Sequence, residues 1–183
     1  YATDTWANIR GANGGTLNTA SATFAMRNLH TAGRGADTYN IGRYFFEFDT
    51  SAITDFLSSA TLKLRGATGI TNLDVMLLKS SHTGDVVAGD FDEISGGGLA
   101  LANSDGSGAG TFASTLVVEY SSEITTWSTS SYNDIALNAT ALADIKDNTT
   151  FNCVLIGYDF DYLDIVLTGG ATHGIGFYTD AYT

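Results

Sequence analysis

The stretch GRYFFEFDTSAITDFLSSATLKLRG, residues 42–66, constrains the fold most, because polar and apolar residues alternate in it twice. Its first half places Tyr44, Phe46 and Phe48 on one side and mostly charged residues on the other, and its second half repeats the pattern. Successive side chains of a β-strand point to opposite faces, so alternation of this period indicates two half-buried strands. A short polar link joins them.

Similar short segments recur along the 183 residues, separated by clusters of Gly, Asn, Asp and Ser without any proline. Many short strands between turn clusters favour an antiparallel sandwich over alternating strands and helices. Asn138–Asn148 alone has clear helical spacing, with Asn138 or Thr140 as its cap. Residues 1–183 are therefore expected to form a single all-β domain with one short helix. The expected strands are Thr5–Arg10, Ala22–Leu29, Gly42–Asp49, Ser58–Gly66, Leu73–Ser80, Ser114–Tyr120, Asn133–Leu137, Asn152–Tyr158 and Gly174–Tyr178. The expected core residues are Phe46, Phe48, Leu62, Leu64, Val75, Leu77, Val154, Ile156 and Phe177.

Charge and hydropathy exclude several classes of partner. The net charge of −12 repels phosphate backbones, and no cluster of Lys or Arg offers a groove for nucleic acid. No apolar run reaches 18 residues, so no membrane span is expected. Low charge with many Thr, Ser, Gly and Asn residues is typical of extracellular, cell-surface or virion-surface β-proteins.

The sequence offers few groups for catalysis. His30, His82 and His173 lack the spacing of metal ligands and lie in polar, turn-like contexts, so they are interpreted as solvated loop residues. Cys153 has no cysteine partner and shares a face with Phe151, so it is expected to be a small buried apolar side chain. The protein is accordingly predicted to be no enzyme and to need no transition metal.

Two acidic clusters are candidates for a structural Ca²⁺ site, and less so for a pair of glycosidase carboxylates. Neither has the spacing of a calcium-binding loop with its glycine and terminal glutamate. No cofactor other than this Ca²⁺ is expected. The clusters are Asp90, Asp92 and Glu93, and Asp159, Asp161 and Asp164.

The sequence contains candidate residues for binding glycans and candidate residues for attaching them covalently. Exposed aromatic rings stack on sugars, although packing in the core is the favoured interpretation of these side chains. Two sequons, NAT at Asn138 and NTT at Asn148, are candidate glycosylation sites expected on the surface. The candidate sugar-binding aromatics are Trp6, Trp127, Tyr158, Phe160 and Tyr162.

The order of the motifs DTWANIR, GRYFFEFDTSAI, LSSATLKL, VVAGDFD, YNDIALNAT and GIGFYTDAYT resembles the DNRLRE-like family of jelly-roll domains. Such domains are found in extracellular proteins of bacteria and archaea and in phage and metagenomic surface proteins. The resemblance covers nearly the whole chain and implies an antiparallel jelly-roll β-sandwich, but no agreed catalytic residues. The matching residues are Arg43, Phe46, Phe48, Asp49, Thr50, Ser51, Ser59, Ala60, Thr61, Leu62 and the segment Tyr132–Thr140.

The resemblance also implies a gap, because family members continue past a similar YT motif with a turn and a closing strand, whereas the sequence ends at Thr183. The position of the closing strand is expected to be filled by further residues of the same chain or by a strand of a neighbouring molecule. The leading hypothesis is a non-enzymatic extracellular structural protein, a fibre or filament subunit that self-associates through β-strand complementation. The alternative is a carbohydrate-binding or adhesion module of a phage tail fibre or bacterial surface protein.

Overall fold

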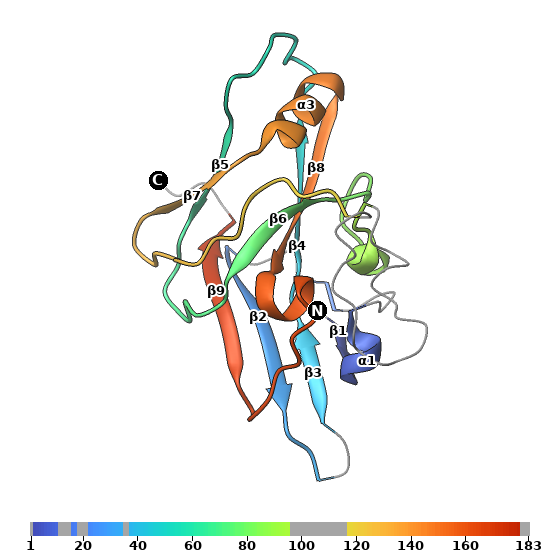
Figure 1. Cartoon of the computed structure of the whole chain (residues 1–183), viewed down its shortest axis with the longest axis vertical. Helices are drawn as coiled ribbons and strands as arrows, with labels where there is room; N and C mark the ends of the chain where they lie inside the picture. The colour runs from blue at the N-terminus through green and yellow to red at the C-terminus, as the bar shows by residue number, and fades with distance from the viewer. Residues whose placement is uncertain (1, 11–15, 18–21, 35–36, 96–116, 180–183) are drawn as a thin grey trace.

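A computed structural model describes residues 2–10, 16–17, 22–34, 37–95 and 117–179 of the chain (Figure 1). Its regular structure is predominantly β, as expected, and every strand pair is antiparallel. The described strands form three sheets. The first has the order β1 (Ala2–Asp4), β3 (Thr38–Ile41), β2 (Thr23–Thr31) and β9 (Thr172–Tyr178); the second has β4 (Tyr44–Asp49), β8 (Thr150–Gly157) and β6 (Val75–Lys79); the third pairs β5 (Thr61–Arg65) with β7 (Tyr132–Ala136).

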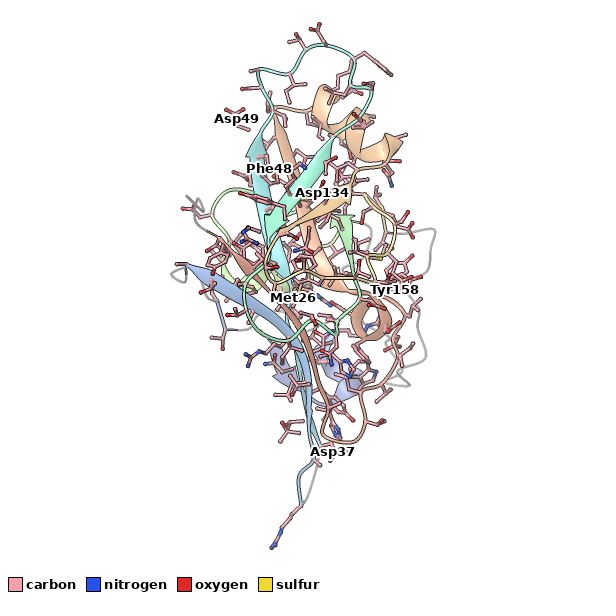
Figure 2. All side chains as sticks on the ribbon, turned by 90° about the vertical axis from the view of Figure 1, so that its left-hand side faces the viewer. Met26, Asp37, Phe48, Asp49, Asp134 and Tyr158 are labelled. Atoms are coloured by element: carbon pink, nitrogen blue, oxygen red, sulfur yellow. The ribbon has the colours of Figure 1, made fainter. Side chains whose placement is uncertain are left out.

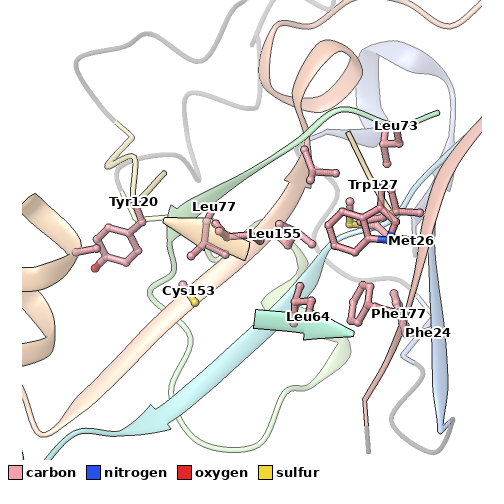
Figure 3. Close-up of a cluster of buried hydrophobic side chains, with 14 of the residues drawn as sticks. Phe24, Met26, Leu64, Leu73, Leu77, Tyr120, Trp127, Cys153, Leu155 and Phe177 are labelled. Carbon is pink, nitrogen blue, oxygen red and sulfur yellow. The ribbon is translucent and has the colours of Figure 1, made fainter. Parts of the chain in front are cut away.

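Side chains from all three sheets meet in one core, because each sheet has an apolar face (Figure 3). Phe177 of β9, Leu64 of β5 and Leu155 of β8 are all buried in it. An antiparallel bridge between Gly66 and Phe177 brings the end of β5 to the end of β9. The two-stranded sheet therefore begins where the four-stranded sheet ends.

The central strand β8 is apolar on both faces, as its sequence CVLIG suggests. Cys153 and Leu155 belong to the main core, whereas Val154 and Ile156 belong to a second apolar cluster on the opposite face of the sheet. Burial raises the pKa of the Cys153 thiol well above its usual range, because the thiolate would lose its hydration. The expectation that Cys153 is a buried apolar side chain is confirmed.

The sequence prediction was wrong at the N-terminus, where Thr5–Arg10 contains a helical turn, α1 (Trp6–Ile9). Trp6 and Ile9, three positions apart, both contribute to a small third cluster, so helical spacing outweighed the apparent alternation. The short strand β3 was missed because its four residues show no distinct alternation. For Ser114–Tyr120, residues 114–116 lie outside the described part and Glu119 forms an isolated bridge with Leu78.

The predicted helix is present as α3 (Ala139–Asp147). The side chain of Asn138 caps it by accepting a hydrogen bond from the Ala141 amide at 3.0 Å, which confirms one of the two expected caps. Two shorter turns complete the described structure: η1 (Ala88–Asp92) and the π-helical turn η2 (Tyr158–Tyr162). No described helix has the length and apolar character needed to cross a membrane.

The Asp144 carboxylate connects α3 to the neighbouring sheet through hydrogen bonds. Its Oδ2 accepts hydrogen bonds from the Tyr120 hydroxyl at 2.5 Å and from Lys79 Nζ at 2.9 Å. Partial burial alone would raise the pKa of Asp144, but these hydrogen bonds and the charge of Lys79 outweigh burial and lower it. The stabilisation is therefore fully present above the unfolded pKa of about 4 and is lost as the pH falls through the lower folded value.

Substitution Asp144→Asn is expected to lower the free energy of unfolding by about 1–2 kcal/mol at pH 7, because it removes the ionised acceptor of two hydrogen bonds. Urea denaturation at pH 7 and pH 3 measures the difference, which should shrink in acid. Asp147→Asn is the matched control, since within the described part of the chain that carboxylate forms an ion pair with exposed Lys146 alone. A difference that stays constant with pH would contradict this role of Asp144.

Candidate functional site

Two residues of the second acidic cluster, Asp161 and Asp164, lie in an ionic network inside the protein. Both carboxylate oxygens of fully buried Asp161 accept hydrogen bonds from the Arg43 guanidinium, at 2.7 Å each. Asp164 contacts Arg10 Nη1 at 3.0 Å and accepts a hydrogen bond from Trp6 Nε1 at 2.9 Å. Two arginines and two aspartates balance in charge, so Asp161 and Asp164 act as internal counter-ions.

Arg43 extends this network to the backbone of two further segments. It donates to the carbonyl oxygens of Phe91 at 2.6 Å and Arg10 at 2.8 Å, and its guanidinium lies 4.2 Å from the centre of the Phe91 ring. The planar, permanently charged guanidinium suits such multiple contacts. Burial lowers the pKa of Arg10, and the charges of Asp161 and Asp164 oppose that shift. In the sequence, Arg43 was noted only as a residue that matches the resembled family, and no role was assigned to Arg10. The available signal for Arg43 was its place immediately before an aromatic strand.

In the first acidic cluster, the carboxylates of Asp90 and Glu93 accept hydrogen bonds from neighbouring segments. Asp90 Oδ2 accepts a hydrogen bond from the Val87 amide at 2.7 Å and so caps η1. Glu93 Oε2 accepts a hydrogen bond from the Ser81 hydroxyl at 2.5 Å. Within the described residues, no three His, Cys, Asp or Glu side chains are grouped so that they could hold a metal ion. The structure therefore does not assemble either predicted set into a Ca²⁺ site.

The candidate sugar-binding aromatics are mostly interior. Trp6, Trp127 and Tyr162 are each only 8% exposed, and Trp127 Nε1 donates to the Gly176 carbonyl oxygen at 2.9 Å. Tyr158 and Phe160 are half-buried, and Tyr158 stacks on Tyr162 with ring centres 5.4 Å apart. The favoured interpretation, packing within the fold, agrees with these positions.

The histidines were wrongly interpreted as solvated loop residues, since His30 and His82 are buried and His173 is half-buried. His30 lies in β2, where its Nδ1 accepts a hydrogen bond from the Gly170 amide at 3.1 Å and its Nε2 is 3.1 Å from Asp37. His82 Nδ1 lies 2.6 Å from the Ser80 hydroxyl. Burial lowers the pKa of His82, although the nearby carboxylates oppose this. These contacts are structural and join loops to strands.

The two sequons differ in their surroundings. Asn138 is half-buried, not exposed as predicted, because its Nδ2 donates to the Glu119 carbonyl oxygen at 2.7 Å while its Oδ1 caps α3. Asn148 is exposed, as predicted, and its Nδ2 donates to the Asp144 carbonyl oxygen at 2.8 Å. A glycan replaces one hydrogen of Nδ2, so Asn148 is the better acceptor in the folded chain.

When the protein is expressed in a host with N-glycosylation machinery, we expect a mass above the bare 19.2 kDa. Asn148→Gln should remove most of the excess, because Asn148 faces solvent and Asn138 is committed to the helix cap. Intact-mass spectrometry measures both variants. An excess that disappears with Asn138→Gln and not with Asn148→Gln would contradict this assignment.

An open groove of about 360 Å³ lies between strands β4, β5 and β9. We call it the β4–β5 groove. Its floor is the aromatic row of β4, one wall is the edge of β5, and the end of β9 closes it. Figure 2 shows Phe48 beside the β5–β7 pair, which carries Asp134. The described lining residues are Tyr44, Phe46, Phe48, Leu62, Lys63, Leu64, Arg65, Tyr132, Phe177, Tyr178 and Thr179.

Phe46, Phe48 and Leu62 were expected in the core, but the groove leaves all three short of full burial. Phe48 is 39% exposed, and its ring stacks on that of Phe46 with centres 6.0 Å apart. The other six expected core residues are buried. The error arises because alternation shows which side chains share a face and not whether that face is covered.

The backbone edges beside this groove have strand partners on one side only in the described structure. β4 pairs with β8, and β5 pairs with β7. Beyond the end of β5, Gly66 bridges Phe177, and the Ala67 amide donates to the Gly176 carbonyl oxygen at 2.8 Å. The groove thus combines an incompletely covered aromatic floor with the edges of two strands, which is the combination an added strand requires.

Comparison with known proteins adds no relative to this description: no model of a protein family, no curated protein and no solved structure matches the chain.

Proposed function

We propose that this protein is a non-enzymatic extracellular structural protein, a subunit of a fibre or filament that self-associates through β-strand complementation. The observation that carries the proposal is the β4–β5 groove, with aromatic side chains on its floor and strand edges beside it. A strand placed there would bury apolar surface and pair backbone groups in the same step.

The proposal includes a jelly-roll sandwich of the DNRLRE-like kind. In support, β5–β7 packs on the same core as the other sheets, and Gly66 and Phe177 join β5 to β9. The closing strand that the resemblance calls for would lie beside β5, over the aromatic floor. Strand exchange between copies is a head-to-tail contact, and repetition of such a contact gives an open filament.

Two features support a structural role over a catalytic one. The carboxylates of Asp161 and Asp164 bind buried arginines, and those of Asp90 and Glu93 bind local hydrogen-bond donors. The proposal therefore assigns no catalytic group. Glycans at Asn148 would lie on the surface of the assembled fibre, at the end of α3.

Light scattering after size exclusion, together with electron microscopy of the same sample, tests the proposal. We expect polymers, with a larger polymer fraction at about 150 mM salt than at 10 mM, because copies with a net charge of −12 repel each other less when screened. A strictly monomeric protein at high concentration under both conditions would overturn the proposal.

A second candidate function, glycan binding, is favoured by one different observation. An open hollow of about 430 Å³ is lined by Trp127 and by Tyr132, which is 54% exposed, together with Thr126, Ser128 and Asp134. Aromatic and polar groups in one hollow suit a sugar. Binding to a glycan array that Tyr132→Ala abolishes in a monomeric sample would favour this adhesion function.

A further inference from the structure

We infer that His82 is a pH-sensitive switch, which holds residues 81–87 against β4 and β8 while its ring is neutral and releases them when the ring gains a proton. The switch lies on the face of the β4–β8–β6 sheet opposite the β4–β5 groove, because the His82 ring contacts Phe45 and the groove is lined by Phe46. It therefore does not depend on polymer formation. The observations behind it are the hydrogen bonds of the ring, its burial and the charged groups around it.

Residues 81–87 are attached to the sheet largely through His82. The His82 ring is 2% exposed and meets the Phe45 ring of β4 edge to face, with ring centres 5.3 Å apart. Asn152 Nδ2 of β8 donates to the His82 carbonyl oxygen at 2.7 Å. The Gly84 amide adds an exposed hydrogen bond to Glu47 Oε2 at 3.1 Å. Movement of the ring out of this position would remove the apolar part of the attachment.

The hydrogen bonds fix which ring nitrogen of His82 carries the proton. The Ser80 hydroxyl donates its single hydrogen to the Glu93 carbonyl oxygen at 2.7 Å, because a carbonyl oxygen only accepts. His82 Nδ1 lies 2.6 Å from the same hydroxyl oxygen and must therefore be the donor of that contact. In the neutral ring, Nε2 then carries a lone pair.

A second proton would go to Nε2, where the described structure provides no acceptor. Nε2 is buried and has no hydrogen-bond partner there. The imidazolium would place a charge and an unsatisfied N–H inside the protein, which costs free energy. Burial accordingly lowers the pKa of His82, and the charges of Asp90, Glu47 and Glu93 oppose this only in part. The stabilisation by the neutral ring is thus fully present above the unfolded pKa of about 6.5 and is lost as the pH falls through the lower folded value.

The groups around the ring favour its outward movement once it is protonated. The strands beside it contribute uncharged Ser80 and Asn152. The described charged groups near it are all acidic: Glu47 of β4, Asp90 of η1, and Glu93. A carboxylate accepts several hydrogen bonds, so each can accept one from the imidazolium in addition to its present donor. Since Nε2 reaches none of them from its buried position, the protonated ring binds them only after it has moved.

Three backbone amides report the release of residues 81–87, because side-chain oxygens accept from all of them: those of His82, Gly84 and Val87. Hydrogen exchange of the full chain is measured at pH 7.5 and at pH 5.5, and each rate is divided by the intrinsic rate of that amide. We expect the protection of these amides to fall at least about fivefold at pH 5.5, while protection in β7 stays within about twofold. Equal protection at the two pH values would overturn the inference.

A pair of substitutions assigns the effect to His82. Asparagine at this position keeps an N–H donor near the place of Nδ1 but cannot gain a proton, so His82→Asn should make the protection of the Gly84 and Val87 amides independent of pH within about twofold. His173→Asn is the matched control, because His173 is half-buried and lies in β9, and it should keep the wild-type dependence. A pH dependence that survives His82→Asn or disappears with His173→Asn would overturn the inference.

Nitrogen NMR of the wild-type His82 ring tests the switch without any substitution. At pH 7.5 we expect the proton on Nδ1 and the lone pair on Nε2. On acidification, Nε2 should gain its proton over the same pH range in which the Gly84 amide loses protection. A neutral ring protonated at Nε2, or a loss of protection while the ring is still neutral, would overturn the inference. None of these results depends on polymers, so the switch and the proposed function are tested separately.

Discussion

Replacing Asp161 with alanine is expected to lower the free energy of unfolding by about 3–5 kcal/mol, a large share of the 5–15 kcal/mol typical of a domain. Asp161 is fully buried and binds the Arg43 guanidinium through both carboxylate oxygens. Its removal leaves Arg43 buried with one fewer counter-ion, and a buried charge without compensation is far more costly than the pair is stabilising. Urea denaturation at pH 7 measures the loss.

Asp159→Ala provides the control in the same turn. Asp159 is half-buried and lies near the Glu123 carboxyl, whose pKa is raised by desolvation and by the negative charges of Asp74 and Asp159. Its removal should change the free energy of unfolding by less than about 1 kcal/mol. Equal losses for Asp159→Ala and Asp161→Ala would show that the turn itself, and not the ionic network, stabilises the protein.

The substitution Gly66→Ala is expected to destabilise the fold by about 3 kcal/mol, because the added methyl group has no room. A Cβ atom at Gly66 would lie 1.7 Å from the carbonyl oxygen of Ser128 and 2.8 Å from its carbonyl carbon. Both are backbone atoms, so relief requires the chain at Ser128 to move away from β5. The Ser128 segment is held by Asn133, whose Oδ1 accepts from the Ser128 amide at 2.7 Å.

Gly176→Ala is the matched control for this effect. A Cβ at Gly176 would meet its nearest atom, the Ala67 carbonyl oxygen, at 3.4 Å, which is an ordinary contact. Thermal unfolding of the two variants should therefore differ by several degrees or more, with Gly66→Ala the less stable. A smaller loss for Gly66→Ala than for Gly176→Ala would contradict the close approach of the two backbones.

The local periodicity of the sequence was sufficient to predict most strands and the helix. Alternation in β4 and β5, and apolar residues on both faces of β8, follow from the geometry of a pleated strand and need no knowledge of distant partners. The turn α1 was mispredicted because a segment of four residues satisfies both periods. Its conformation depends on the contacts of Trp6 and Ile9 in the fold.

The candidate site was predictable only in part, because it depends on which edges meet. The sequence identified Phe46 and Phe48 as neighbours on one face, but their incomplete burial depends on how β4, β5 and β9 come together around the groove. The acidic cluster containing Asp161 was recognised, yet its partner Arg43 is 118 positions away. No local pattern connects the two residues, since only the tertiary fold brings them together.

The reactivity of the Cys153 thiol can report whether the β4–β5 groove is occupied. Cys153 is the register partner of Phe46 in β4, so the single thiol of the chain lies next to the aromatic floor, shielded from water. A thiol reagent reaches it only when the side chains packed over this face of β8 move away. The rate of labelling therefore measures how often this part of the core opens, and the strand proposed to bind over Phe46 would slow it without any engineered probe.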